Sequence, residues 1–157
     1  MGGVYKLVAV CDNGNWEPAI KISESLSKVP NPGHKYVWRL YDQRGKATAD
    51  LIGLDSDNPH NMEKIVLRHP TNHTKCRVLT HDDISEIEIL LEDMLIEGNT
   101  VYKLPDIEEM RKKRELDIER LDAGVRRIMN PHIYHVSLTQ HLWNLKQDLI
   151  ANAIQID

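Results

Sequence analysis

The sequence has 157 residues, of which 41% are hydrophobic and 28% charged, as expected of a globular domain with a core of its own. Its formal net charge of −4 gives no electrostatic reason to expect a nucleic acid or an anionic membrane as partner. With two cysteines, no membrane-length apolar run and no signal-peptide pattern, the sequence predicts a cytoplasmic protein without a disulfide framework.

The first half of the chain has the pattern of antiparallel strand pairs. Residues 4–10 are nearly all apolar, which predicts a well-buried strand, and the Asn13-Gly14 pair favours a tight turn into a second strand over residues 16–23. Two more pairs are predicted, residues 36–41 with 47–54 and residues 64–68 with 75–79. Residues 1–80 are therefore predicted to form an antiparallel β region.

The second half changes to helical spacing. Residues 82–95 are acidic with apolar side chains at near-helical intervals, which leaves a short helix and an irregular covering segment both open. The clearest helix begins at Asp106, whose carboxylate can cap free backbone N–H groups while Glu109 completes a capping box. Apolar residues at helical intervals extend this predicted helix to about residue 129.

A last helix is predicted to start near Ser137, with Gln140 as its box partner, and to run to about residue 153, after a break at Asn130-Pro131. Residues 81–157 are thus expected to be a helical C-terminal extension that packs on the β region as one compact unit. The predicted fold class is α+β, an antiparallel β-rich N-terminal half followed by two C-terminal helices.

The sequence contains none of the motifs G-x-S-x-G, H-E-x-x-H and C-x-x-C, and we expect no catalytic residue in it. His69, His73, Cys76 and His81 are of types that bind zinc. However, Pro70 keeps His69 and His73 from sharing one face of a helix, and the spacing matches no usual zinc pattern. Solvent-facing histidines in a turn are the better interpretation, and no metal site is expected.

Three ring side chains, His132, Tyr134 and His135, follow Pro131 between the two predicted helices. A general acid–base histidine needs a partner within hydrogen-bond reach, which spacing alone does not supply. Side chains that pack the two helices together are the favoured interpretation.

One stretch of this acidic chain is basic. Lys21, Ser23, Lys28 and Lys35, with Arg39 beyond them, alternate cations and a hydroxyl, a combination that attracts phosphate groups. Exposed lysines also commonly have no specific partner. Lys21, Ser23, Lys28 and Lys35 are therefore candidate phosphate-binding residues, with plain solvent exposure as the alternative.

Several segments, in order, resemble the C-terminal third of bacterial nicotinate phosphoribosyltransferases. They are residues 2–9 (Gly-Gly-Val-Tyr-Lys-Leu-Val-Ala), 21–25 (Lys-Ile-Ser-Glu-Ser), 31–35 (Asn-Pro-Gly-His-Lys), 38–42 (Trp-Arg-Leu-Tyr-Asp), 49–52 (Ala-Asp-Leu-Ile), 85–88 (Ser-Glu-Ile-Glu), 130–134 (Asn-Pro-His-Ile-Tyr) and 142–147 (Leu-Trp-Asn-Leu-Lys-Gln). No single block decides the resemblance, which rests on their order and spacing over nearly the whole chain.

The resemblance implies the C-terminal piece of a larger enzyme that couples nicotinate to phosphoribosyl pyrophosphate, with ATP and Mg²⁺, to make nicotinate mononucleotide for NAD synthesis. The family's type II phosphoribosyltransferase architecture joins an α/β barrel to a β-rich domain, and its active sites form between the subunits of a dimer. Its phosphate-binding glycine loop and catalytic histidine precede the segment that this chain matches. The resemblance therefore implies a structural role, with no cofactor bound by this chain itself.

The implied partners are the N-terminal barrel portion of the same enzyme and further copies of the chain. Some relatives carry a four-cysteine zinc site in this region, but Cys11 and Cys76 alone cannot supply it. The alternative is a free-standing binding or interaction module derived from the same segment.

Overall fold

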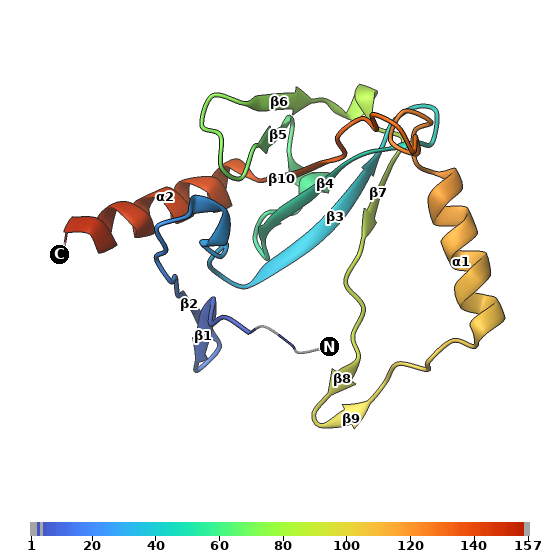
Figure 1. Ribbon diagram of the computed structural model, residues 1–157. Helices are drawn as coiled ribbons and strands as arrows, with labels where there is room; N and C mark the ends of the chain where they lie inside the picture. The colour runs from blue at the N-terminus through green and yellow to red at the C-terminus, as the bar shows by residue number, and fades with distance from the viewer. Residues whose placement is uncertain (1–2, 4, 156–157) are drawn as a thin grey trace.

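The computed structural model describes residues 3 and 5–155. At its centre is a six-stranded sheet in the order β6-β5-β10-β4-β3-β7 (Figure 1). Its strands are β3 (Lys35–Tyr41), β4 (Ala47–Leu54), β5 (Ile65–Arg68), β6 (Cys76–Leu79), β7 (Glu86–Ile89) and β10 (His135–Leu138). β10 runs parallel to β4, and the other neighbouring strands are antiparallel. The α+β class is confirmed, with a mixed sheet in place of a wholly antiparallel one.

The first predicted hairpin forms apart from the central sheet. β1 (Ala9–Asp12) and β2 (Asn15–Pro18) are joined by Asn13 and Gly14, both at positive φ. The prediction of a well-buried strand over residues 4–10 is wrong where the structure describes them, since Tyr5 is 94% exposed; Val4 lies outside the described residues. Among the described residues, β1 and β2 pair only with each other, and the ring of Trp16 stacks on that of His34 at a centroid distance of 4.4 Å.

The core fills one face of the sheet. Trp38 pairs with Leu51 and Leu40 with Ala49, so alternation along β3 and β4 turns all four side chains to the same side. The neighbouring strands and turns extend this cluster with Ile65, Leu67, Leu79 and Ile84. Removing these side chains from water is the main favourable contribution to folding.

α2 (Gln140–Gln155) packs against β4 and β5. The hydroxyl of Thr139 accepts a hydrogen bond from the backbone N–H of Leu142 (3.2 Å), which places the helix start after Thr139. The predicted start at Ser137 is wrong, because Ser137 belongs to β10. Gly53 permits this close approach: a Cβ there would lie 2.5 Å from the Cγ2 of Thr139.

Two strands of the central sheet come from residues after 80. Residues 86–89 form β7 beside β3, and their alternation turns Ile87 towards the core. β10 lies between β4 and β5, so the extension that was predicted to be helical also contributes strands. The division of the chain at residue 80 stays a prediction.

Residues 90–119, here called the arm, leave the sheet after β7 and return through α1 (Ile107–Glu119), as Figure 1 shows. A small hairpin of β8 (Leu95–Ile96) and β9 (Asn99–Thr100) lies at its turning point. The predicted capping box is present: the carboxylate of Asp106 accepts the N–H of Glu109 (2.8 Å), and the carboxylate of Glu109 accepts the N–H of Asp106 (2.9 Å).

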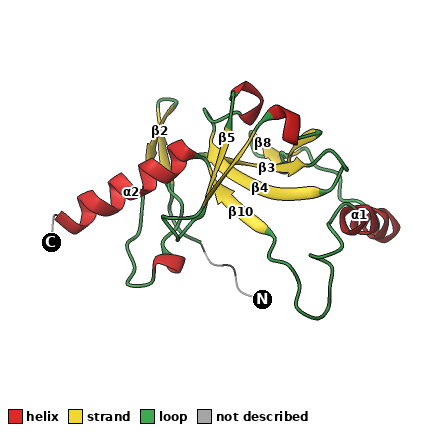
Figure 2. Cartoon of the chain, turned by 90° about the horizontal axis from the view of Figure 1, so that it is seen from above, coloured by secondary structure: helices red, strands yellow, loops and turns green. Residues whose placement is uncertain are grey.

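α1 stops ten residues before its predicted end. The chain after Glu119 turns back to the sheet, where the carbonyl of Arg120 accepts the N–H of Ala47 (2.8 Å) and Leu121 bridges to Ala47. No residue of α1 is buried, and the view in Figure 2 shows the helix at the edge of the molecule, away from α2. Among the described residues, no helix is long and apolar enough to cross a membrane.

Candidate functional site

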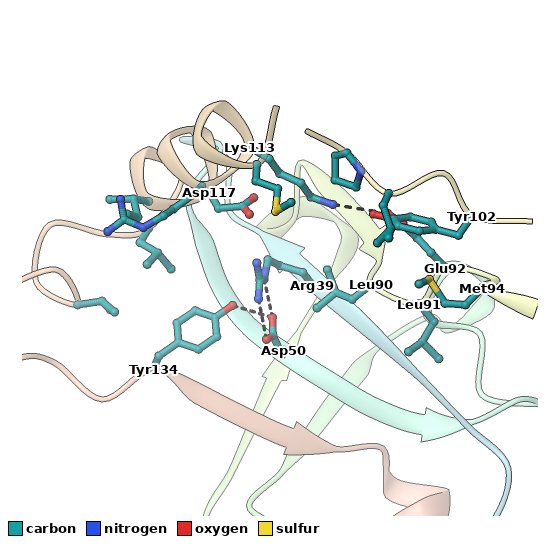
Figure 3. Close-up of a pocket in the computed structure, with 17 residues that line it drawn as sticks. Arg39, Asp50, Leu90, Leu91, Glu92, Met94, Tyr102, Lys113, Asp117 and Tyr134 are labelled. Carbon is teal, nitrogen blue, oxygen red and sulfur yellow. Dashed lines mark hydrogen bonds and ion pairs between the residues drawn. The ribbon is translucent and has the colours of Figure 1, made fainter. Parts of the chain in front are cut away.

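A groove of about 1040 Å³ lies between the sheet and the arm (Figure 3). β3 and β4 supply its floor, and the arm supplies most of its wall. A hollow of this size is large enough for a ligand or for the side chains of a second polypeptide surface. The polar and apolar side chains that line the groove show which of these two uses fits it better.

Three polar side chains join at the floor. Arg39 donates two hydrogen bonds to the carboxylate of Asp50, from Nε at 2.8 Å and Nη2 at 3.0 Å. The two residues are direct cross-strand partners in β3 and β4. The hydroxyl of Tyr134, from the segment just before β10, donates to Oδ1 of the same carboxylate at 2.8 Å (Figure 3). We call Arg39, Asp50 and Tyr134 the floor triad.

Arg39 and Tyr134 of the floor triad are each held in one protonation state. The hydrogen bond to Asp50 raises the pKa of Arg39 above its ordinary value. Burial, with the hydrogen bond to Asp50, raises the pKa of the Tyr134 phenol. Arg39 therefore stays charged and Tyr134 neutral at ordinary pH, and the charge of Arg39 is balanced by Asp50.

The wall of the groove is mainly apolar. Leu91 and Met94 from the coil after β7, Leu104 before α1 and Met110 within α1 all line it and are about half or more exposed. At the rim, Lys113 of α1 lies 3.5 Å from a carboxylate oxygen of Glu92. The ion pair joins two parts of the arm itself, and the apolar side chains of the wall stay open to water.

This lining suits contact with protein better than it suits catalysis. The floor cation is already paired, and large apolar side chains left in water are typical of surfaces that a polypeptide covers. Within residues 3 and 5–155, no three His, Cys, Asp or Glu side chains are grouped so as to hold a metal ion.

A comparison with known proteins matches the part of the chain that forms the groove. A family model described as the nicotinate phosphoribosyltransferase C-terminal domain matches residues 34–146, which includes the floor triad and the arm. The chain belongs to this family.

Full-length relatives show how much of the protein the match represents. Nicotinate phosphoribosyltransferase of Bacillus subtilis is 27% identical over 151 residues, which is 96% of this chain and 30% of the relative. The human enzyme is 31% identical over 152 residues, 96% of this chain and 27% of the relative. The chain thus spans less than a third of the length of these relatives.

A solved structure gives the same picture. The crystal structure of human nicotinic acid phosphoribosyltransferase superposes with a TM-score of 0.66 at 25% sequence identity, covering 76% of this chain and 23% of that one. The sheet and helices described above are therefore a part of the fold of a longer relative.

The predicted phosphate-binding residues lie away from the groove. Lys21 is exposed in coil and Ser23 half-buried, Lys28 is exposed in a 3₁₀ turn, and Lys35 opens β3. Burial lowers the pKa of Lys35, whose ammonium donates to the carbonyl of Gly33. Among the described residues, no hydrogen bond joins these four side chains to one another. Their binding role stays a prediction.

Of the remaining candidates, Tyr134 alone reaches the groove. His132 donates its backbone N–H to the carbonyl of Gly124, and His135 begins β10. The four zinc-type residues are spread out: His73 packs edge-on against Trp143, and His81 bonds the carbonyl of Met62. His69 and Cys76 line a separate pocket.

A second polar cluster was not predicted at all. The guanidinium of Arg120, just after α1, lies 3.3 Å from the centroid of the Tyr41 ring and pairs with Glu86. The Tyr41 hydroxyl donates to Glu88. The alternation of Glu86 and Glu88 along a strand is the available signal, but the sequence leaves a short helix and an irregular covering segment open for residues 82–95.

Proposed function

We propose that this chain forms the C-terminal part of a nicotinate phosphoribosyltransferase and supports the structure of that enzyme without supplying its chemistry. The observation that carries the proposal is the family match over residues 34–146, in a chain that spans 30% of its Bacillus subtilis relative. The reaction is the coupling of nicotinate to phosphoribosyl pyrophosphate, with ATP and Mg²⁺, which makes nicotinate mononucleotide.

The groove supports a structural role. Displacing pyrophosphate from ribose requires free charged groups to hold phosphates and a metal ion. Arg39 donates two hydrogen bonds to Asp50, and Lys113 lies beside Glu92, so two of the three cations that line the groove are already paired. The apolar wall fits the barrel portion of the same enzyme as its covering surface, and we propose that portion and a second copy of the chain as partners in a cytoplasmic homo-oligomer.

The basic stretch from Lys21 to Lys35 makes the one direct contribution to substrate binding that we propose. Lys21, Ser23, Lys28 and Lys35 would add positive charge near a phosphate of phosphoribosyl pyrophosphate once the barrel is present. Replacing Lys21, Lys28 and Lys35 by Met in the active enzyme is then expected to raise the KM for phosphoribosyl pyrophosphate. An unchanged KM and kcat would remove this part of the proposal.

The experiment measures nicotinate mononucleotide formation by this chain alone, and by a chimera in which it replaces the matching C-terminal part of the Bacillus subtilis enzyme. We expect no product from the chain alone and product from the chimera. A chimera that melts in one cooperative transition but makes no product would contradict the proposal and favour a free-standing interaction module, for which the exposed apolar arm already provides a surface. Activity of the chain alone would contradict the structural role.

A further inference from the structure

A second pocket, of about 370 Å³, lies where β5, β6 and β10 meet, outside the groove described above. We propose that it binds a small molecule through a phosphate group. The inference stands apart from the proposed enzyme reaction, because it rests on the side chains of this pocket alone.

The sheet and the β5–β6 turn bring several donors to one place. Leu67 of β5 lies opposite Arg77 of β6, and Ser137 of β10 precedes Leu138, the partner of Arg68. Alternation therefore turns Ser137 and Arg77 to the side of Leu67. His69 and Lys75, at the two ends of the β5–β6 turn, also line the pocket, together with Thr74, Cys76 and His135.

Ser137 forms the polar part of the pocket floor. The residue is 6% exposed, yet its hydroxyl has no hydrogen-bond partner among the described residues. Fully buried side-chain N and O atoms in the same part of the chain all have one. The hydroxyl is therefore reached from the pocket, where it is available to a ligand. A ligand oxygen would satisfy it.

His69 presents a defined donor. Its Nδ1 accepts backbone N–H groups from Thr71 (3.2 Å) and Asn72 (3.0 Å), so Nδ1 carries no proton. In the neutral ring the proton is then on Nε2, which makes that atom a hydrogen-bond donor. This turn geometry also fixes the ring in place before any ligand arrives.

The charge of the pocket selects an anion. Lys75 and Arg77 line it, and none of the described lining residues is acidic. Arg77 donates one N–H to the hydroxyl of Thr48 (2.9 Å), and its guanidinium has four further N–H donors. In contrast to Arg39, this guanidinium forms no ion pair with a carboxylate among the described residues, although its charge helps to lower the pKa of Asp83.

A phosphate group fits these donors better than a carboxylate does. Hydroxyl, imidazole, guanidinium and ammonium donors line the pocket from β10, β6 and the β5–β6 turn. A tetrahedral phosphate offers three oxygens in different directions, where a planar carboxylate offers two. The volume is at the small end of ligand sites and still exceeds a single phosphate ion, so the ligand is a small phosphate ester.

The test is titration of the 157-residue chain with ribose 5-phosphate and with inorganic phosphate at constant ionic strength, followed by amide chemical shifts in NMR. We expect a Kd of about 1 mM or tighter for the ester, weaker binding of inorganic phosphate, and shifts confined to residues 67–77 and 135–137. No saturable shift for either probe, or shifts centred elsewhere, would overturn the proposal.

Variants separate a built site from general attraction. K75Q/R77Q is expected to weaken binding at least about tenfold, and S137A to weaken it by several-fold because one hydrogen bond to a charged group is lost. K103Q/K112Q removes the same charge from exposed residues of the arm, away from this pocket, and is the matched control. Equal loss in the control and in K75Q/R77Q, or unchanged affinity in S137A, would show surface attraction only.

Discussion

At the residue scale, the carboxylate of Asp50 accepts hydrogen bonds from two side chains that are far apart in the sequence. Arg39 comes from the neighbouring strand, while Tyr134 lies 84 residues further along. The side chains of Arg39 and Asp50 are 24% and 13% exposed, so their pairing is partly shielded from water. Removing one member of a partly buried ion pair is more destabilising than replacing both members, because the remaining charge is left without a partner.

We therefore predict that D50N lowers the free energy of unfolding by about 3 kcal/mol, since it leaves Arg39 without its counter-charge. Urea unfolding of the chain measures this difference. D148N is the matched control: Asp148 is exposed, and its replacement is expected to change stability by no more than about 0.5 kcal/mol. Equal effects of the two substitutions would contradict the structural role of the floor triad.

Tyr41 gives the chain a pH dependence with a defined sign. Burial, with the hydrogen bond to Glu88, raises the pKa of the Tyr41 phenol to about 12, above the ordinary tyrosine value of about 10. The folded state therefore favours the protonated phenol. The stability that this group contributes is fully present below pH 10 and is lost as the pH rises from about 10 to about 12.

We predict that wild type is more stable than Y41F at neutral pH, by about 1 kcal/mol, and that this difference shrinks between pH 10 and 12. Y41F lacks the titrating group and keeps most of the ring, so subtraction cancels the other groups that titrate in this range. Urea unfolding at a series of pH values measures it. A difference that stays constant with pH would show that the Tyr41 hydroxyl is not held by Glu88.

At the element scale, β10 is the strand that ties the end of the chain to its middle. It lies between β4 and β5, and Leu138 is wholly buried while Val136 is 44% exposed. We predict that L138A lowers the free energy of unfolding by about 2–5 kcal/mol through loss of burial and a residual cavity. V136A, a smaller deletion at an exposed position of the same strand, is expected to cost less than about 1 kcal/mol. Similar losses in urea unfolding would mean that β10 is not part of the core.

The sequence predicted those elements whose determining residues lie close together in the chain, and missed those that depend on contacts with distant strands. The β3–β4 and β5–β6 pairs were predicted from alternation and turn residues, and the start of α1 from its capping box; all of these signals lie within a few residues of each other. β10 was not predicted, because four residues before a helix cap carry too little pattern. Its strand conformation comes from the two strands on either side of it.

The candidate site was less predictable than the fold for the same reason. Arg39 was noted as part of a basic stretch and Tyr134 as a linker residue, but nothing in their spacing joins either of them to Asp50. Their contact depends on the parallel pairing of β10 with β4, which the sequence did not predict. The groove in turn depends on where α1 ends, and the apolar repeat continued past that point.

α1 is an element whose stability is local. None of its residues is buried, so its first turn depends on the capping box of Asp106 and Glu109 more than on packing. We predict that D106A destabilises this turn by about 1 kcal/mol and speeds amide exchange at residues 107–110, while the midpoint of global unfolding stays unchanged. E115Q, in the middle of the same helix and exposed, is the control that leaves exchange near wild type.

Hydrogen exchange followed residue by residue distinguishes the outcomes. A fall in the global midpoint with D106A would show that α1 unfolds together with the sheet. No change in exchange at all would show that the arm is held by contacts other than its cap.

At the scale of the whole molecule, apolar surface is concentrated on the arm. Leu95, Leu104, Ile107 and Leu116 are each more than 60% exposed, in addition to the half-exposed wall of the groove. A monomeric protein rarely leaves so much contiguous apolar surface in water, and burying it yields roughly 25 cal/mol per Å². If the barrel portion covers the arm in a longer enzyme, the chain on its own should bury the same surface against other copies.

We therefore predict that the isolated chain self-associates, with a mass that rises with concentration in light scattering. L95K/L104K/L116K places charges on the arm and is expected to shift the chain towards monomer. I128K/M129K/I133K adds the same charge to three exposed apolar side chains outside the arm, at 80–100% exposure, and should leave association as in wild type. A concentration-independent monomer mass for wild type would refute the prediction. If the second variant dissociates the chain and the first does not, the covering surface lies in the segment before β10, and the barrel contact that we propose would have to be sought there.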